Sequence, residues 1–349
     1  MKRAYIALSA ILLGACAHHY RIVGYVTPRA DISRISAREL THINYAFGKV
    51  SESGDVILNA DAPAKLAQLQ ALKAENPHLK VILSIGGWGA DNFSDAAFNR
   101  ATRDRFTRSA MTILEEYALD GIDLDWEYPG QPGPGIKYRE EDKEDFTLLL
   151  KDLRQQLDAL SDARGRHGAD RYSLSIATAG GPYFQHTEME KLHKYVDWIN
   201  IMGYDFAGEW SKTTEHHAPM SGAESFVRQH LAAGIPSRKL VLGVPFYGRA
   251  WCGTSGLHEP VEAYAASIPF AVIERQYIGH GFERHWDRAE HAPYLWSSSE
   301  GIFVTYEDVQ SLRYKADFVK RNHLGGMMFW EMSDDPDQVL LSVMFNALR

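Results

Sequence analysis

The chain has 349 residues, of which 45% are hydrophobic, 11% aromatic and 23% charged. This is the composition of an ordinary packed globular protein, and it excludes disordered, collagen-like and multi-span membrane classes. Lys and Arg number 37 against 45 Asp and Glu, which gives a net charge of −8. Such a field repels phosphate backbones, so we expect no nucleic-acid partner.

The N-terminus has the pattern of an export signal. A basic start precedes an apolar stretch over residues 5–15 that is too short to span a bilayer. The sequence LGAC at 13–16 resembles the lipobox of bacterial lipoproteins. It predicts removal of residues 1–15, a lipid on Cys16, and a place on the outer membrane or cell surface of a bacterial envelope. The alternative is a soluble secretory signal, with a periplasmic or secreted product.

After this signal, short β-branched and aromatic runs alternate with longer stretches of helical period. This alternation is typical of βα units that build a parallel sheet. Eight repeats predict a (β/α)8 TIM barrel over residues 20–349, with the active site on the loops at the C-terminal ends of the strands. The expected strands are 21–26, 42–47, 80–85, 121–126, 173–178, 198–204, 241–246 and 326–330. The main expected helices are 64–75, 95–118, 142–160, 223–233 and 306–320.

One interval breaks this rhythm. The stretch between Arg249 and Gly325 is more than twice as long as a βαβ crossover of about 30 residues. Its surplus, residues 251–305, is rich in aromatic side chains. We interpret it as a small inserted α+β subdomain between strands seven and eight that walls a groove on the top face. A stabilising role remote from the site is the alternative.

The chemistry is concentrated in the sequence Asp120-Gly-Ile-Asp123-Leu-Asp125-Trp-Glu127. Because side chains alternate along a strand, Asp123, Asp125 and Glu127 share one face, which we expect to point into the barrel. Stacked carboxylates oppose one another's ionisation, which predicts a shared proton and a raised pKa for one of them. Glu127, nearest the mouth, is the predicted general acid. Asp120 has the opposite parity and is expected to be structural.

Two other interpretations of the acidic strand stay open. A solvated strand is one, although the flanking Ile122, Leu124 and Trp126 favour burial. A Mg²⁺ or Ca²⁺ site is the other, since three carboxylates offer oxygen ligands. No His/Asp pair at a convincing spacing stands out at the other strand ends. We therefore expect no metal and no cofactor.

These residues resemble the family 18 glycoside hydrolases, the chitinase family, and the resemblance covers the whole chain after the signal. The Asp-x-x-Asp-x-Asp-x-Glu pattern of that family is complete. Its supporting motifs occur on the expected strands. They are Gly24-Tyr25, Phe47, Ser84-Ile85-Gly86-Gly87, Met202-Gly203-Tyr204-Asp205, Tyr247-Gly248-Arg249 and Trp330.

The resemblance implies retaining hydrolysis of β-1,4-linked N-acetylglucosamine, in which the 2-acetamido oxygen of the substrate is the nucleophile. On this basis Glu127 would protonate the leaving oxygen and later activate water. Asp125 would orient the acetamide and stabilise the oxazolinium, and Asp123 would hold the proton of Asp125. Tyr204 and Asp205 would bind the acetamide and the flanking sugar hydroxyls.

The resemblance also implies a set of substrate-binding and supporting residues. Trp330, Tyr25 and Phe47 would form a floor beneath the sugar, because the axial C–H bonds of a pyranose suit an aromatic face. Trp88, Tyr128 and Trp210 are candidates for neighbouring subsites, although a Trp in a barrel is more often part of the core. The other expected positions are Met202 and Arg249 for substrate, with an ion pair as the alternative for Arg249, and Ser84, Gly86 and Gly87 as supports of the acidic strand.

A carbohydrate-binding lectin on the same fold is a rival from another class. Lectins of the family typically lack the terminal Glu, whereas Glu127 is present here. Among enzymes, the runner-up is an endo-acting hydrolase of N-glycan cores or of peptidoglycan-like glycans. The expected partner is chitin or an N-acetylglucosamine oligosaccharide. A membrane is expected to be contacted only through the lipid anchor, and the chain is expected to be a monomer.

Overall fold

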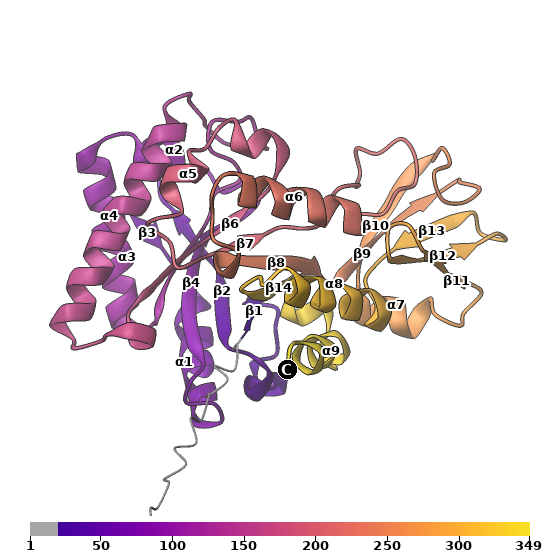
Figure 1. The fold of residues 1–349 in the computed structure, drawn as a ribbon, viewed down its shortest axis with the longest axis horizontal. Helices are drawn as coiled ribbons and strands as arrows, with labels where there is room; N and C mark the ends of the chain where they lie inside the picture. Colours follow the sequence, from indigo (N-terminus) through magenta and orange to yellow (C-terminus); the bar gives the residue numbers. More distant parts are fainter. Residues whose placement is uncertain (1–19) are drawn as a thin grey trace, which may run out of the picture.

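The computed structural model describes residues 20–349, so the predicted signal and Cys16 lie outside the described residues. Eight parallel strands form one sheet, and the pairing of the first strand with the second closes it into a barrel (Figure 1). This confirms the (β/α)8 TIM barrel. The strands are β1 Arg21–Val26, β2 His42–Val50, β4 Lys80–Gly86, β5 Gly121–Asp125, β6 Ser173–Thr178, β7 Trp198–Ile201, β8 Leu240–Pro245 and β14 Gly326–Trp330. A short strand, β3 Val56–Ile57, pairs antiparallel with the end of β2.

Two strands differ by three residues from the expected bounds: β2 continues to Val50 rather than ending at residue 47, and β7 ends at Ile201 rather than at residue 204. The amide of Gly203 turns back to the carbonyl of Ile201 at 2.8 Å, so the ladder stops there. Two residues later Asp205 adopts a positive φ of 61°. The chain therefore leaves the sheet before the predicted site residues of this motif.

Helices lie outside the barrel strands (Figure 1). The predicted helix over 95–118 is two helices, because Asn99 starts a new one: its side chain accepts hydrogen bonds from the amides of Ala101 and Thr102. The helices are α1 Ala62–Ala71, α2 Phe93–Ala97, α3 Arg100–Glu116, α4 Asp142–Ala163, α5 Met189–Leu192, α6 Met220–Ala232, α7 Phe270–Gln276, α8 Val309–Arg321 and α9 Val339–Leu348.

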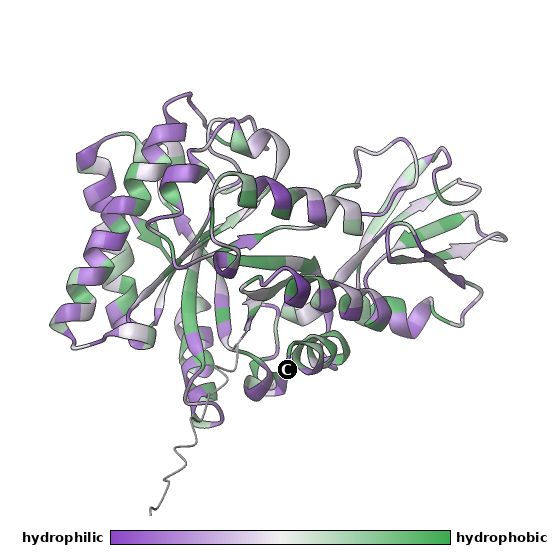
Figure 2. Cartoon of the chain, viewed as in Figure 1, coloured by the Kyte–Doolittle hydropathy of each residue, from purple (hydrophilic) through white to green (hydrophobic). Residues whose placement is uncertain are grey.

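The main core lies between the strands and the helices, as the apolar strands and the apolar sides of the helices show in Figure 2. The apolar face of the acidic strand belongs to it, since Ile122 and Leu124 are fully buried. Trp126 stacks on Phe93 of α2 at a centroid distance of 5.3 Å. With this face packed on helices, the alternate positions of β5 point into the barrel, and the interpretation as a solvated strand is wrong.

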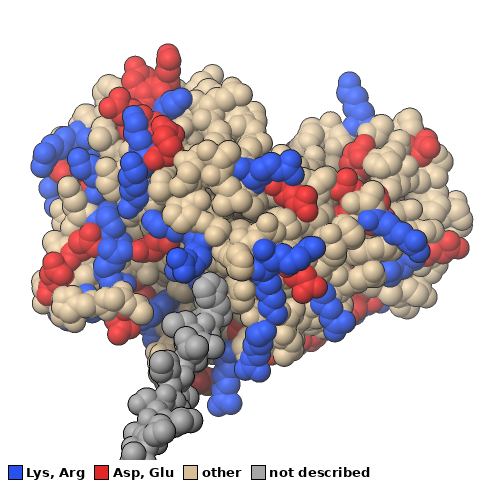
Figure 3. Space-filling model, viewed as in Figure 1, with Lys and Arg blue, Asp and Glu red and all other residues tan. Residues whose placement is uncertain are grey.

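A second, antiparallel sheet follows β8. Its order is β10-β9-β13-β12-β11, and the space-filling surface is hollowed between it and the barrel (Figures 1 and 3). It begins at Tyr247, four residues before the expected start, because the chain passes through Phe246 directly into the sheet. Its strands are β9 Tyr247–Cys252, β10 Ala263–Pro269, β11 Glu283–Asp287, β12 Ala292–Ser297 and β13 Ile302–Thr305, and α7 lies between β10 and β11.

This sheet has a small core of its own around the buried Trp251 and Phe303. The indole of Trp251 also donates to the carbonyl of Gly208 in the loop after β7, at 3.3 Å. The sheet is thus attached to the loop that carries Tyr204 and Asp205. Over residues 20–349, no helix is long and apolar enough to cross a membrane.

Candidate active site

Three carboxylates lie in a row that runs from the interior of the barrel to its mouth. Asp123 is fully buried, Asp125 is 5% exposed, and Glu127, two residues beyond the end of β5, is partly exposed. Positions two residues apart on a strand share a face, which accounts for the row. The structure therefore brings together the three acidic residues that the sequence placed on one face.

Asp123 is held by donors from four other strands. Tyr25 of β1 and Ser84 of β4 each donate to Oδ2 at 2.8 Å. Ser175 of β6 donates to Oδ1 at 2.6 Å, and Asn200 of β7 donates to the same atom at 3.3 Å. Burial raises the pKa of Asp123, and these bonds oppose that rise by favouring the ionised form.

The expectation that Asp123 holds the proton of Asp125 stays a prediction, and this arrangement gives it no support. No hydrogen bond joins the two side chains within the described residues, and the donors just described occupy both oxygens of Asp123. Oδ1 of Asp125 is buried without a hydrogen-bond partner. Asp125 is thus the carboxyl group of the row that lacks protein donors, whereas both oxygens of Asp123 accept hydrogen bonds.

The two outer carboxyl groups have raised pKa values. Burial, and then the charges of Glu127 and Asp123, raise the pKa of Asp125 well above its ordinary value. Burial raises the pKa of Glu127 to about 7, while Lys49 and a hydrogen bond from Tyr128 pull it down. A substantial fraction of Glu127 is therefore protonated at neutral pH, which a general acid requires.

Two glycines let the end of β4 approach the acidic strand. Gly86 and Gly87 have φ of 127° and 86°, values that favour glycine. A Cβ on Gly86 would lie 2.0 Å from the carbonyl oxygen of Asp125, and one on Gly87 would lie 2.4 Å from the ring of Phe47. Any side chain here would therefore displace either the acidic strand or the aromatic ring beside it.

Phe47 and Trp330 form an aromatic floor. Their rings stack at a centroid distance of 5.4 Å and an interplanar angle of 16°, and both are partly exposed. Tyr25, which was expected on this floor, is only 1% exposed and donates to Asp123. Its inward position on β1 places it beneath the floor, so the expectation that it contacts sugar is corrected.

The other aromatic candidates differ in exposure. Trp88 is 65% exposed and Trp210 is 59% exposed, so the alternative that they belong to the core is wrong. Tyr128 packs edge-on against Trp88, with ring centroids 6.2 Å apart. Met202 is 9% exposed and packs in the cluster inside the barrel, which limits it to a minor contact with any ligand.

Asp205 is oriented by the second sheet. Tyr247 of β9 donates to Oδ1 at 2.7 Å, and Arg249 of the same strand forms an ion pair with that oxygen at 2.7 Å. The ion pair that the sequence left open for Arg249 is present. These partners and His217 hold the pKa of Asp205 below its ordinary value although burial alone would raise it. Oδ2 has no hydrogen bond within the described residues and stays available to a ligand.

Two further predicted positions have distinct surroundings. Burial, and then the charge of Asp125, raise the pKa of Tyr204 well above its ordinary value, so the phenol remains a donor. Asp120 lies at the opposite end of β5, where Lys73 contacts it at 2.6 Å and Arg166 at 2.9 Å. These ion pairs connect the start of β5 to the segments that carry Lys73 and Arg166, which fits a structural role for Asp120.

Several residues around the site escaped the sequence interpretation. Ser175 and Asn200 are polar residues at inward positions of β6 and β7. The alternation of side chains along these strands could have identified them. Lys49 and His217 carried none, because their partners are distant along the chain, and Tyr247 was named in a motif without its contact to Asp205. Within residues 20–349, no group of three or more His, Cys, Asp or Glu side chains is placed to hold a metal ion.

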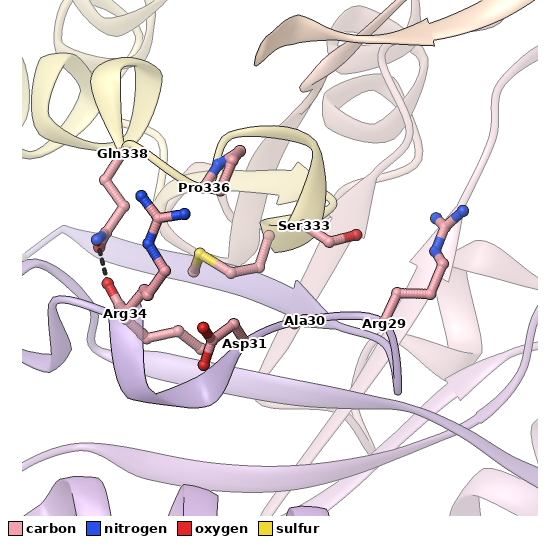
Figure 4. Close-up of a pocket in the computed structure, with 9 residues that line it drawn as sticks. Arg29, Ala30, Asp31, Arg34, Ser333, Pro336 and Gln338 are labelled. Atoms are coloured by element: carbon pink, nitrogen blue, oxygen red, sulfur yellow. Dashed lines mark hydrogen bonds between the residues drawn. The ribbon is translucent and has the colours of Figure 1, made fainter. Parts of the chain in front are cut away.

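A separate pocket of about 130 Å³ lies between the loops that follow β1 and β14 (Figure 4). Arg29, Arg34 and Gln338 are among its lining residues, and Gln338 donates to the carbonyl of Arg34. None of the three stacked carboxylates lines it. This pocket is therefore distinct from the acidic site.

The fold and site define a (β/α)8 barrel whose fourth strand, β5, carries a row of carboxylates beside an aromatic floor. The sequence pattern described as glycosyl hydrolases family 18 matches residues 21–335. The chain belongs to this family.

Known relatives agree with that membership. Chitinase A1 of Niallia circulans is 36% identical over 93% of this chain, and the match covers 58% of that protein. The chitinase ChiW of Paenibacillus sp. strain FPU-7, described as a multi-modular enzyme expressed on the bacterial cell surface, has a TM-score of 0.88 at 35% identity over 94% of this chain and 43% of its own. An N-acetylglucosaminidase of Paenibacillus barengoltzii has a TM-score of 0.87 at 37% identity, over 95% of this chain and 100% of its own. This chain thus spans about half the length of the first two.

Proposed function

We propose that the protein hydrolyses β-1,4-linked N-acetylglucosamine chains, such as chitin, with retention of anomeric configuration. The observation that carries this proposal is the row of carboxylates, in which a partly protonated Glu127 stands above an Asp125 that lacks protein donors. Family membership and the activities named for the relatives support the substrate class. The presence of Glu127 favours an enzyme over a lectin.

In the proposed reaction, the acetamide oxygen of the substrate attacks the anomeric carbon while the bond to the leaving oxygen breaks. Glu127 gives its proton to that oxygen, and an oxazolinium forms. Water then attacks the anomeric carbon and gives its proton to Glu127, so the acid is restored and the product is the β-anomer.

Asp125 is the group we assign to the acetamide. Its buried Oδ1 without a protein partner can accept the acetamide N–H and face the positive charge of the oxazolinium. Asp123, saturated by its own donors, supplies a fixed negative charge below. Tyr204 and the free Oδ2 of Asp205 are placed to bind the acetamide and sugar hydroxyls. Phe47 and Trp330 would support the sugar, and the exposed rings of Trp88 and Trp210 would serve neighbouring sugars.

The test of the proposed function is release of a fluorophore from mono-, di- and tri-N-acetylglucosaminyl glycosides. We expect release from at least one of the three and none from the matching cellobioside, which lacks acetamides. Preference for the dimer would indicate trimming from a chain end, and preference for the trimer would indicate internal cleavage. Absence of release from all three would contradict the proposal.

We further propose that the mature protein is tethered to a bacterial envelope by a lipid on Cys16, on the basis of the sequence at 13–16. Labelling of expressing cells with a radioactive fatty acid is expected to mark the wild type and to fail with Cys16→Ser. A matched control is Cys252→Ser, which should keep the label. An unlabelled wild type, or label on Cys16→Ser, would rule the anchor out.

A further inference from the structure

Lys49 is a basic side chain of β2 that the proposed reaction does not use. Lys49 as a whole is exposed, but its Nζ donates a hydrogen bond of 2.6 Å to the carbonyl oxygen of Gly86. Nζ also lies 5.0 Å from the centroid of the Phe47 ring, one of the two rings of the aromatic floor. The ammonium is therefore held over one ring of this floor.

A local irregularity of β2 brings Lys49 to this place. Ala46 pairs with Ser84 and Gly48 pairs with Ile85, so β2 contributes one extra residue against β4. Because Gly48 lies opposite Ile85, Lys49 is the next residue of β2 just as Gly86 is the next residue of β4. A side chain as long as that of lysine then reaches the Gly86 carbonyl from the neighbouring strand.

Gly86 is also the point where β4 meets the acidic strand. It pairs with Asp125 in the register of β4 and β5. A Cβ on Gly86 would lie 2.0 Å from the carbonyl oxygen of Asp125, and the amide of Gly87 donates to that oxygen at 2.8 Å. The charge of Lys49 is thus anchored to a backbone junction that contacts Asp125 directly.

We propose that Lys49 is a positioning residue, whose positive charge, fixed on the Gly86 carbonyl beside Asp125 and Glu127, sets the pH range over which the site is active. This inference rests on the proposed function. The competing explanation is that Lys49 only caps the Gly86 carbonyl and covers Phe47.

Other charged and titratable groups face the same two carboxyl groups. Asp123 of β5 and Asp205 after β7 add negative charge. Four phenols stay protonated because burial raises the pKa of each: Tyr25 of β1, Tyr128 after β5, Tyr183 after β6 and Tyr204 after β7. Lys49 is the basic group that acts on both carboxyl groups, and it lowers the pKa of each.

The charges of Lys49 and of the two carboxylates affect one another's pKa values. Burial lowers the pKa of Lys49, and the charges of Asp125 and Glu127 oppose that fall. Removing the positive charge makes both carboxylates harder to ionise, so both pKa values rise. The acidic limb of the profile reports a carboxylate that must be ionised, and the alkaline limb reports a protonated Glu127. Both limbs should therefore move to higher pH.

The experiment compares kcat/KM against pH for the wild type, Lys49→Met and Lys49→Arg. Met keeps the apolar stem and removes the charge, whereas Arg keeps the charge. We expect both limbs to move up by about half a pH unit to one unit in Lys49→Met, and to stay near the wild-type values in Lys49→Arg. An unmoved profile in Lys49→Met, or equal shifts in the two variants, would overturn the proposal.

A second measurement does not depend on turnover. Carboxyl groups labelled with ¹³C are titrated by NMR, and the Glu127 resonance is assigned by its loss in Glu127→Gln. We expect its midpoint to rise in Lys49→Met relative to the wild type. An unchanged midpoint would overturn the role of Lys49 even if the wild type is active. A raised midpoint in a protein that releases no fluorophore would uphold the electrostatic effect and contradict the proposed function alone. Melting temperatures verify that both variants are folded.

Discussion

Glu127→Gln is expected to lower kcat on an N-acetylglucosaminyl glycoside by about a hundredfold or more, the usual effect of losing a general acid. The amide has nearly the same shape but cannot give a proton to the leaving oxygen. The sugar contacts of Phe47 and Trp330 are untouched, so binding of the oligosaccharide should persist. For the same reason, turnover by the wild type should fall as the pH rises through the Glu127 pKa of about 7.

The measurements are initial rates, intrinsic tryptophan fluorescence with added oligosaccharide, and melting temperature. Glu75→Gln is the matched control, because Glu75 is exposed at the end of the first helical segment and far from β5 in the chain. It should keep wild-type kcat. Near-normal turnover by folded Glu127→Gln would remove Glu127 from the role of acid.

Fully deacetylated glucosamine oligomers are expected to resist hydrolysis, whereas their N-acetylated counterparts are cut. A covalent enzyme intermediate needs a second carboxyl group roughly 5 Å from the acid and across the bond, and inversion needs a wider gap. Asp123 and Asp125 lie on β5, the strand that leads directly to the acid. In the proposed mechanism the acetamide is therefore both the nucleophile and the carrier of positive charge.

Three observations check this mechanism. The first product seen by NMR should be the β-anomer, before mutarotation. A stable thiazoline mimic of the oxazolinium should inhibit, because it resembles the intermediate. Asp125→Asn should lose turnover on acetylated chains while remaining folded. An α-anomeric first product, or comparable cleavage of glucosamine-only chains, would be incompatible with the assignment of Asp125 to the acetamide.

The barrel was predictable because each of its strands carries a local signal. β1, β6 and β14 have the bounds that the hydrophobic runs predict, since a buried parallel strand is apolar on both faces. The helix over 95–118 was predicted as one because its apolar period continues through Asn99. Only the cap on the amides of Ala101 and Thr102 divides it.

By itself, the sequence determined which residues of the acidic strand share a face, because alternation along a strand needs no partner. It also determined the positions of the motifs at the strand ends. The tertiary structure decided how those groups interact. Asp123 has donors from four other strands and leaves Asp125 without one, Tyr25 lies under the floor, and Lys49 reaches the acidic strand through Gly86. These contacts join residues from different strands, and closure of the barrel brings them together, so no local pattern of the sequence could reveal them.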